Sequence, residues 1–403
     1  MDKNLNPRYR FNRLELAGSL GDLGTLLPLA LGMILVNGLN PTGIFFTIGL
    51  FYVLSGVYYG VTVPVQPMKV IGAYAIATGL SAHQVLAAGA LMGIFLLVIG
   101  ASGAISLISR YTPGSVVRGV QLSVGALLIR QGVQFIIGTS RFQELQKAAE
   151  PYLSLSTLGP IPIGIAIGIV AGILTLLLLE NKKLPASLVV IGGGIAIGLI
   201  FGTNAGLDNL RIGIHLPDVL PFGWPGAIDF SMALVLLVLP QVPMTLGNAV
   251  IAYVDLSENY YKEASSSVTY RRACISMALA NFVSFFFGGM PMCHGAGGLA
   301  AHYRFGARTA GSNIFIGAIF VIMALLLGDQ VVIVSRLIPI SVLGVLLIFA
   351  GAQLAMTIRD VRERKALFVT LLMLGITLAS NLAVAFVTGM AMAWILKSKR
   401  LAV

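Results

Sequence analysis

Long runs of apolar residues that carry almost no charge constrain this chain more than any other feature. They cover residues 161–179, 188–201, 314–327 and 367–379. Runs of this length and composition are typical of helices that lie in a lipid bilayer. The composition agrees, because 57% of the residues are hydrophobic and 10% are charged, whereas soluble domains carry about a quarter charged residues. We therefore predict an all-α integral membrane protein with many spans.

The charge and the cysteines exclude other classes of protein. The chain has only two cysteines, Cys274 and Cys293, so it is not a disulfide scaffold, and its redox compartment stays open. Its net charge of +11 does not indicate nucleic acid, because the basic residues lie in short connectors between the apolar runs. Residues 1–13 are polar and lack the apolar core of a cleaved signal peptide, so the first span is expected to stay in the membrane.

A window of about twenty residues divides the chain into fourteen segments. The first seven are 14–37, 41–61, 66–80, 84–108, 114–138, 160–180 and 185–203, and the second seven are 229–253, 272–287, 291–303, 310–328, 338–357, 365–380 and 381–397. The third and the tenth are too short, and too interrupted by glycine and proline, to cross a hydrocarbon core of about 30 Å. We interpret these two as half-helices.

The basic residues predict the orientation. With fourteen spans both termini lie on one face, and most connectors rich in lysine and arginine fall on that same face. The basic residues of the opposite face are Arg141, Lys147, Arg211 and Arg336. Basic connectors face the cytoplasm, so both termini are expected to be cytoplasmic. A bacterial plasma (inner) membrane is favoured, because no transit segment precedes the first span.

The two halves of the chain resemble each other weakly. Pro67-Met68 matches Pro291-Met292 at an offset of 224, and residues 113–116 match residues 339–342 at 226. Because seven spans is an odd number, the second copy would enter the membrane from the opposite side. Interrupted helices at corresponding positions of inverted repeats mark the binding site of many transporters.

The first interrupted segment combines an extended approach with a helix start. Residues 63–70 read VPVQPMKV, and proline suits the first turn of a helix. We expect the amides that follow Pro67, from Met68 onward, to lack intrahelical acceptors and to form an anion site, with Gln66 and the charge of Lys69 beside them. The alternative is a structural ion pair between Lys69 and Asp22, because a lysine at membrane depth needs a partner or an aqueous cavity.

The second interrupted segment repeats this design. Residues 287–298 read FGGMPMCHGAGG, with a helix start expected at Pro291. The amides of Met292, Cys293 and His294 would then face those after Pro67, and Gly295 would let a ligand approach closely. A phosphate-binding loop is disfavoured, because no Gly-Lys-Ser/Thr ending follows.

Two other chemistries are open to this segment. Cys293, His294 and His302 could hold a metal ion, but a closed zinc site needs a fourth ligand, so we predict neither a metal nor a cofactor. Cys293 and His294 could serve as nucleophile and base of a membrane-embedded enzyme. On a helix they would point about 100° apart, so we expect no enzyme.

Polar residues of the first and eighth segments complete the candidate site. Asp22 lies within an apolar span and is a site candidate for that reason. Gln241 and Thr245 are expected to wall the cavity, and the alternative for them and for Asn248 is hydrogen bonding between helices. Two helix N-termini of about half a charge each, together with Lys69, suit a dianion. Since an ionised Asp22 would spoil this balance, our hypothesis is proton-linked uptake through Asp22.

At these residues the sequence resembles the molybdate transporter family of plants, algae and bacteria, a branch of the sulfate-permease superfamily. Two signatures carry the resemblance, YG followed by PVQPMK at residues 59–60 and 64–69, and FGGMPMCHGAGGLA followed by HYRFGART at residues 287–300 and 302–309. The stretch GDLGT at residues 21–25 is also similar. Ala310 departs from the family pattern, which usually has glycine there.

The resemblance implies a fold of 7+7 inverted repeats, divided into a core domain and a gate domain. The core would comprise residues 1–108 and 204–328, and the gate residues 109–203 and 329–403. It also implies a secondary active transporter that imports molybdate between half-helices 3 and 10, by motion of the core past the gate. Tungstate is expected to compete.

Three other functions stay open at this point. A sulfate-preferring permease is the first alternative, because composition does not report the size of the cavity. A nucleobase carrier is expected to have carboxylates rather than Lys69 at the half-helices. A channel would show uptake that does not saturate. The expected partners are the oxyanion and the lipid bilayer, with no nucleic acid, and the sequence leaves open whether the protein forms a homodimer.

Overall fold

The computed structural model describes residues 8–105, 113–181, 184–203 and 206–398. Part of the predicted fourth segment, 106–108, and the basic residues Lys182 and Lys183 lie outside them. The helices of the first half are α1 (Arg13–Ser19), α2 (Leu23–Asn37), α3 (Pro41–Tyr59), α4 (Lys69–Thr78), α5 (Ala82–Ser102), α7 (Gly114–Ile137), α8 (Arg141–Gln146), α9 (Ile163–Leu178) and α10 (Ala186–Phe201).

The second half contains a corresponding series of helices. They are α11 (Ala227–Ala233), α12 (Leu239–Met244), α13 (Ala252–Tyr261), α14 (Tyr270–Phe286), α15 (Ala296–Arg304), α16 (Ala310–Leu327), α17 (Val331–Ser335), α18 (Ile340–Ala355), α19 (Arg364–Ala379) and α20 (Leu382–Ile395). Each predicted segment coincides with a helix or a group of helices. By length and composition, 6 described helices are able to cross a membrane, or 7 if one bent pair is a single span.

Two predicted spans are interrupted helices. The first splits into α1 and α2, which meet at an angle of 43°, and Asp22 lies at this break. The eighth runs from α11 to α13 through two π-helical stretches, η2 (Leu234–Val238) and η3 (Thr245–Ile251). π-Helical turns occur frequently at functional sites, and these two flank α12, which carries Gln241.

The helices of the two repeats pack in a reciprocal way. α3 packs on α16, α5 packs on α14, and α7 crosses α18, so each pair joins one repeat to the other. At the crossing of α7 and α18, a Cβ on Gly125 would lie 2.6 Å from the carbonyl oxygen of Gly351, and a Cβ on Gly351 would lie 2.6 Å from that of Gly125. Only glycine allows so close an approach of the backbones. The offset of 226 between these residues matches the repeat found in the sequence.

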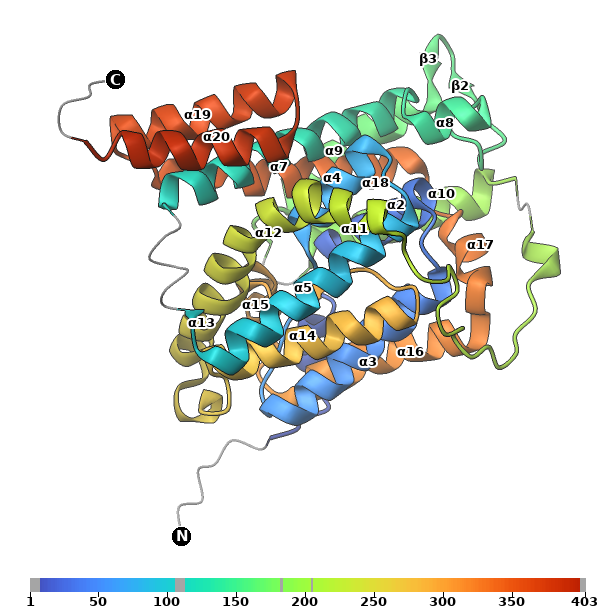
Figure 1. The fold of residues 1–403 in the computed structure, drawn as a ribbon. Coiled ribbons are helices and arrows are strands. Elements are labelled where there is room, and N and C mark those ends of the chain that lie inside the picture. The colour runs from blue at the N-terminus through green and yellow to red at the C-terminus, as the bar shows by residue number, and fades with distance from the viewer. Residues whose placement is uncertain (1–7, 106–112, 182–183, 204–205, 399–403) are drawn as a thin grey trace.

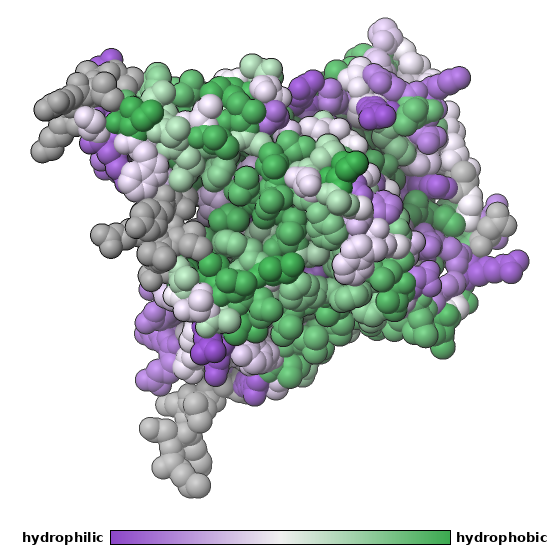
Figure 2. Space-filling model, viewed as in Figure 1, coloured by the Kyte–Doolittle hydropathy of each residue, from purple (hydrophilic) through white to green (hydrophobic). Residues whose placement is uncertain are grey.

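The hydrophobic surface and the polar connectors lie on different parts of the bundle. Figure 2 shows a broad hydrophobic surface across the middle of the molecule, with hydrophilic residues gathered toward its two ends. In Figure 1, α13 and the end of α20 lie on the left, while α8, α17 and the hairpin of β2 (Thr157–Leu158) and β3 (Ile161–Pro162) lie on the right. The connectors that the sequence assigns to opposite faces thus lie at opposite ends.

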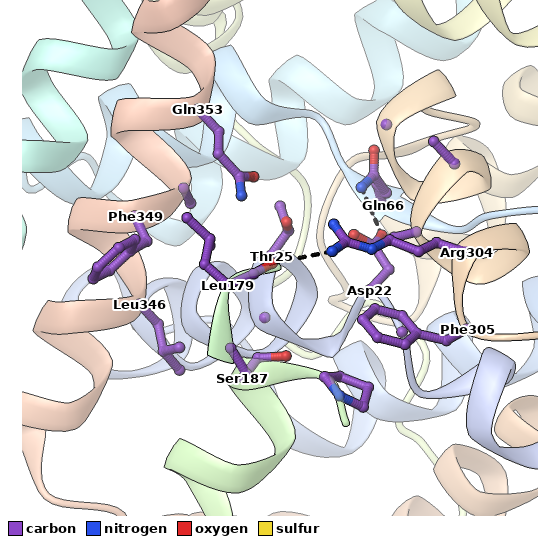
Figure 3. A pocket seen from close by; sticks show the side chains of 18 of the residues that line it. Asp22, Thr25, Gln66, Leu179, Ser187, Arg304, Phe305, Leu346, Phe349 and Gln353 are labelled. Atoms are coloured by element: carbon purple, nitrogen blue, oxygen red, sulfur yellow. Dashed lines mark hydrogen bonds between the residues drawn. The ribbon is translucent and has the colours of Figure 1, made fainter. Parts of the chain in front are cut away.

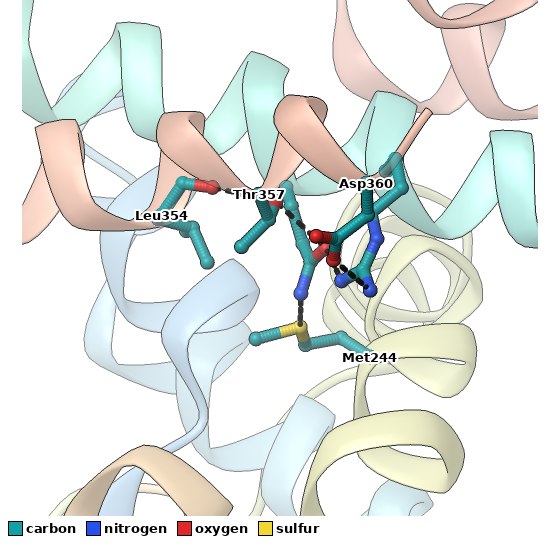
Figure 4. Close-up of polar contacts among 6 residues, drawn as sticks. Met244, Leu354, Thr357 and Asp360 are labelled. Carbon is teal, nitrogen blue, oxygen red and sulfur yellow. Dashed lines mark hydrogen bonds and ion pairs between the residues drawn. The ribbon is translucent and has the colours of Figure 1, made fainter. Parts of the chain in front are cut away.

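One polar network connects α7, α12 and the end of α18 (Figure 4). Arg118 forms an ion pair of 2.6 Å with Asp360, in the 3₁₀ turn η6 (Met356–Asp360). Gln121 accepts a hydrogen bond from Thr357 and donates one to the sulfur of Met244. Asp360 is 61% exposed, so the ion pair itself contributes little stability. The network links α12 to the α7–α18 pair.

A buried carboxylate holds the start of α18. Glu150, in the connector after α8, accepts hydrogen bonds from the amides of Ile340 at 2.9 Å and Ser341 at 2.8 Å. These amides lack intrahelical acceptors, so the carboxylate of Glu150 serves as their acceptor. Burial raises the pKa of Glu150 above its ordinary value, because the loss of hydration outweighs the hydrogen bonds from Ser341 and Ile340.

This shift predicts how stability depends on pH. The native protein holds the Glu150 proton more tightly than the unfolded chain, so the resulting stabilisation is complete below the unfolded pKa and is lost as the pH rises through the native pKa. We expect the melting temperature to rise as the pH is lowered from about 8 to about 5. The variant Glu150→Gln should lose part of that rise. Glu144→Gln, at an exposed position of α8, is the control. Identical pH profiles for Glu150→Gln and the natural protein would contradict the prediction.

Candidate functional site

Two short antiparallel strands join the half-helices. Strand β1 (Gln66–Pro67) pairs with β4 (Met292–Cys293), with Gln66 opposite Cys293 and Pro67 opposite Met292. The amide of Met68 extends the ladder by donating to the carbonyl of Pro291 at 2.9 Å. Since these strands come from equivalent positions of the two repeats, they bring α4 and α15 together at one place.

The expected helix starts are wrong by several residues. α4 begins at Lys69 rather than at Pro67, and α15 begins at Ala296 rather than at Pro291. Both prolines lie in the extended stretches before the helices, because these stretches pair with each other instead of joining the helices. The Met292 amide is therefore no part of a helix start, and it donates to Asn281 Oδ1 at 3.0 Å.

The N-terminus of α4 is capped by a side chain from α12. Gln241 Oε1 accepts from the amides of Val70 at 3.0 Å and Ile71 at 3.3 Å, and its Nε2 donates to Thr245 Oγ1 at 2.9 Å. Gln241 thus makes a hydrogen bond between helices, which the sequence analysis gave as the alternative to walling the cavity. It also bonds to Thr245 one turn further along. The amide of Met68 is bonded as well. The amides on either side of Lys69 therefore already donate to protein oxygens.

His294 and Cys293 support the strands. His294 is fully buried, and its ring nitrogens lie 2.9 Å from the Pro64 carbonyl and 3.0 Å from Ser276 Oγ. Cys293 Sγ lies 4.0 Å from the Pro67 carbonyl. The imidazole is thus directed to Pro64 and Ser276, not to the Cys293 thiol. Within the described part of the chain, no three His, Cys, Asp or Glu side chains gather as metal ligands would.

Asp22 and Gln66 form a tight pair beside the start of α15. Gln66 Nε2 donates to Asp22 Oδ2 at 2.6 Å, and both residues are at least 95% buried. A Cβ on Gly298 would lie 2.7 Å from Asp22 Oδ2, and one on Gly295 would lie 1.8 Å from Gln66 Oε1. These glycines therefore leave the space that the pair occupies. Gln66 Oε1 is buried and has no hydrogen-bond partner.

Lys69 brings a positive charge to this site. Its side chain is half-buried, and it comes within 3.8 Å of the position that a Cβ on Gly297 would take. Among the described residues no carboxylate lies within ion-pair distance of Lys69. The carboxylate of Asp22 is bonded to Gln66 instead. Lys69 also lines the adjoining cavity.

That cavity has a volume of about 320 Å³. Asp22, Gln66 and Lys69 line it. Figure 3 shows Asp22 and Gln66 on one side, facing residues of α10 and α18 on the other. Such a volume equals roughly ten water molecules at about 30 Å³ each. A tetrahedral oxyanion would fit with part of its hydration shell.

Several lining residues are not evident from the sequence. Arg304, at the end of α15, lines the cavity and donates to the carbonyl of Leu179 at 3.2 Å. Ser187 of α10 and Gln353 of α18 contribute polar groups from the opposite wall (Figure 3). Arg304 lies within the second signature, but a basic residue in a connector between spans indicates topology rather than a site.

His302 completes the surroundings of Asp22. It is buried on α15, its Nδ1 lies 2.7 Å from the Gly18 carbonyl, and its Nε2 lies 3.4 Å from the hydroxyl of Tyr52. Both nitrogens therefore already face protein groups. This arrangement ties α15 to α1 and α3.

Several known proteins are similar to this chain in sequence. The family described as "Molybdate transporter of MFS superfamily" matches residues 14–128 and 233–354, which is more than half of the chain. Molybdate transporter 2 of Arabidopsis thaliana is 31% identical over 96% of this chain and 88% of its own length. The chain belongs to the molybdate transporter family. Molybdate transporter 1 of Chlamydomonas reinhardtii is 28% identical over 93% of this chain and 90% of its own length.

Solved structures define the fold of this member of the family. The transmembrane domain of a cyanobacterial bicarbonate transporter, BicA, superposes with a TM-score of 0.64 at 16% identity, covering 94% of this chain and 97% of that domain. Murine Slc26a9, an anion transporter in the inward-facing state, gives a TM-score of 0.67 at 15% identity, covering 97% of this chain and 69% of that one. The predicted 7+7 inverted-repeat fold is therefore confirmed, and the protein is a multi-pass membrane transporter.

Proposed function

We propose that this transporter imports molybdate, which binds in the cavity beside Lys69. The observation that carries the proposal is a half-buried lysine with no carboxylate partner in the described structure, lining a cavity between two groups of helices. Arg304 adds a second positive charge at the cavity wall. Two cations against one carboxylate suit a divalent oxyanion, and the family's relatives named above are molybdate transporters.

We assign distinct roles to the candidate residues. Lys69 is proposed to contact the oxyanion, and Gln66 to contact it when its amide is free to turn from Asp22. Met68, Met292, Cys293 and His294 are proposed to shape the site through the paired strands. Gly295 would keep the approach open, and Gln241 and Thr245 would hold the start of α4 in place.

Alternating access is proposed as motion of the core past the gate. The proposed core, residues 1–108 and 204–328, supplies Asp22, Gln66, Lys69 and Arg304, whereas the proposed gate, residues 109–203 and 329–403, supplies Ser187 and Gln353. The cavity thus lies at the boundary of the two. We further propose that it opens to the cytoplasm, with both termini on that side of the plasma membrane, because its lining includes Leu179 and Pro185, at the two ends of a basic connector.

Uptake into proteoliposomes tests the function. We expect purified protein to take up molybdate with saturable kinetics, tungstate to compete, and sulfate in large excess to compete weakly. Uptake that sulfate abolishes would assign the protein to sulfate-preferring permeases. Uptake that never saturates would indicate a channel.

Replacing Asp22 by asparagine tests proton coupling. Asparagine keeps the size of the side chain and its hydrogen bonding to Gln66 but cannot exchange a proton. We expect molybdate uptake driven by an inward proton gradient to fall by about tenfold or more, while exchange of molybdate across the vesicle membrane without a gradient continues. Full uptake with an unchanged pH dependence in Asp22→Asn would contradict this role.

A further inference from the structure

A second cavity lies outside the oxyanion site, on the membrane-facing side of α3 and α14. It has a volume of about 430 Å³, and apolar atoms form nearly all of its lining. Leu54, Tyr58 and Leu279, which line it, are each more than half exposed. The transport mechanism proposed above does not use this groove.

The groove has the length of one leaflet. It follows α3 from Thr47 to Tyr58, and α14 runs beside it from Val283 back to Ile275. Eleven helical steps of about 1.5 Å amount to roughly 16 Å, about half of a hydrocarbon core of about 30 Å. An acyl chain of one leaflet would therefore fill the groove from its end to the middle of the membrane.

Two arginines lie at one end of the groove. The guanidinium of Arg272 lies 5.9 Å from the centre of the Tyr58 ring, and Arg8 donates to the carbonyl of Val57. Both arginines are exposed, and the single ion pair in the described chain joins two other residues. Their end of the groove is the one that the sequence assigns to the cytoplasm, where anionic lipids attract basic residues.

We propose that this groove binds one acyl chain of an anionic phospholipid, with the phosphate of its headgroup at Arg8 and Arg272. The lipid would also contact residues that pack against His294, which supports the half-helices. Phe51 in the groove wall stacks on His294 at 4.8 Å, and Ser276 is within 3.0 Å of the same ring. Lipid occupancy would thus stabilise the packing of α3 and α14 around His294. This proposal does not depend on which anion the protein transports.

Native mass spectrometry of the full-length protein tests the proposal. The lipid retained by protein purified with phosphatidylglycerol is compared with that retained by protein purified with phosphatidylcholine. We expect one phosphatidylglycerol per chain to be retained in preference to phosphatidylcholine. The double variant Arg8→Ala/Arg272→Ala should retain phosphatidylglycerol about tenfold less. Arg364→Ala removes one positive charge from an exposed position at the start of α19 and should leave retention unchanged.

A second variant separates the groove from the charges. Leu54→Trp fills the groove but keeps both arginines, and its side chain faces lipid, so the fold should tolerate it. We expect it to reduce lipid retention and to remove the rise in melting temperature that phosphatidylglycerol gives the natural protein. Equal retention of both lipids, equal losses in Arg364→Ala and the double variant, or full retention in Leu54→Trp would each overturn the proposal.

Discussion

Replacing Lys69 by alanine should raise the apparent KM for molybdate strongly. The substitution removes the positive charge that lines the cavity at the start of α4, where the neighbouring amides of Met68 and Val70 already bond to protein oxygens. A charged hydrogen bond lost from a partly buried site costs about 2–3 kcal/mol, or roughly 30- to 150-fold in affinity. The apparent KM for molybdate in proteoliposomes measures this loss.

Two controls make the Lys69 result specific. Lys69→Arg keeps the charge and should retain part of the uptake, although its planar group does not match the geometry of an ammonium. Lys365→Ala removes a lysine that donates to the carbonyls of Leu396 and Ser398, away from the cavity. Wild-type uptake in Lys69→Ala would exclude the proposed site.

Replacing Gly298 by alanine should have an effect of similar size without removing any polar group. The new Cβ would lie 2.7 Å from Asp22 Oδ2 and 2.9 Å from Gln66 Nε2, so the pair would have to move away from α15. Overpacking of this kind costs about 1–3 kcal/mol. Because the displaced residues line the cavity, we expect uptake to fall by about tenfold or more.

The matched control for Gly298 is Gly375→Ala. Gly375 lies within α19, and a Cβ there would meet no atom within 4 Å. It therefore adds the same methyl group in an open position and should preserve uptake. Uptake of the Gly298→Ala protein at the level of Gly375→Ala would show that the space beside Asp22 is not needed for transport.

The membrane-spanning part of the fold follows from local sequence. Apolar runs such as residues 161–179 have one favourable environment, and in lipid the backbone must satisfy its hydrogen bonds within the helix. The segments and the repeat could therefore be predicted, and the offset of 226 reappears where Gly125 meets Gly351. Resemblance to a family supplied the expected 7+7 inverted-repeat fold.

The structure of the site depends on contacts between distant residues. Pro67 and Pro291 each fit a helix start by local rules, but β1 and β4 pair across more than two hundred residues and keep both prolines extended. In the same way, no local pattern indicates that Gln241 caps α4 or that Arg304 reaches Leu179. Asp22 and Lys69 could be chosen as candidates from sequence alone, because a charge within an apolar span is rare enough to stand out.

The pairing of β1 with β4 has a consequence for the energetics of transport. Because buried backbone hydrogen bonds tie the two half-helices together, the oxyanion's immediate surroundings would move as one rigid body. Its ligands would then be the same whichever compartment it faces, and the two dissociation constants would be nearly equal. Such a carrier on its own only brings the anion to electrochemical equilibrium, so further accumulation would require the proposed proton gradient, and reversing that gradient should drive stored molybdate out.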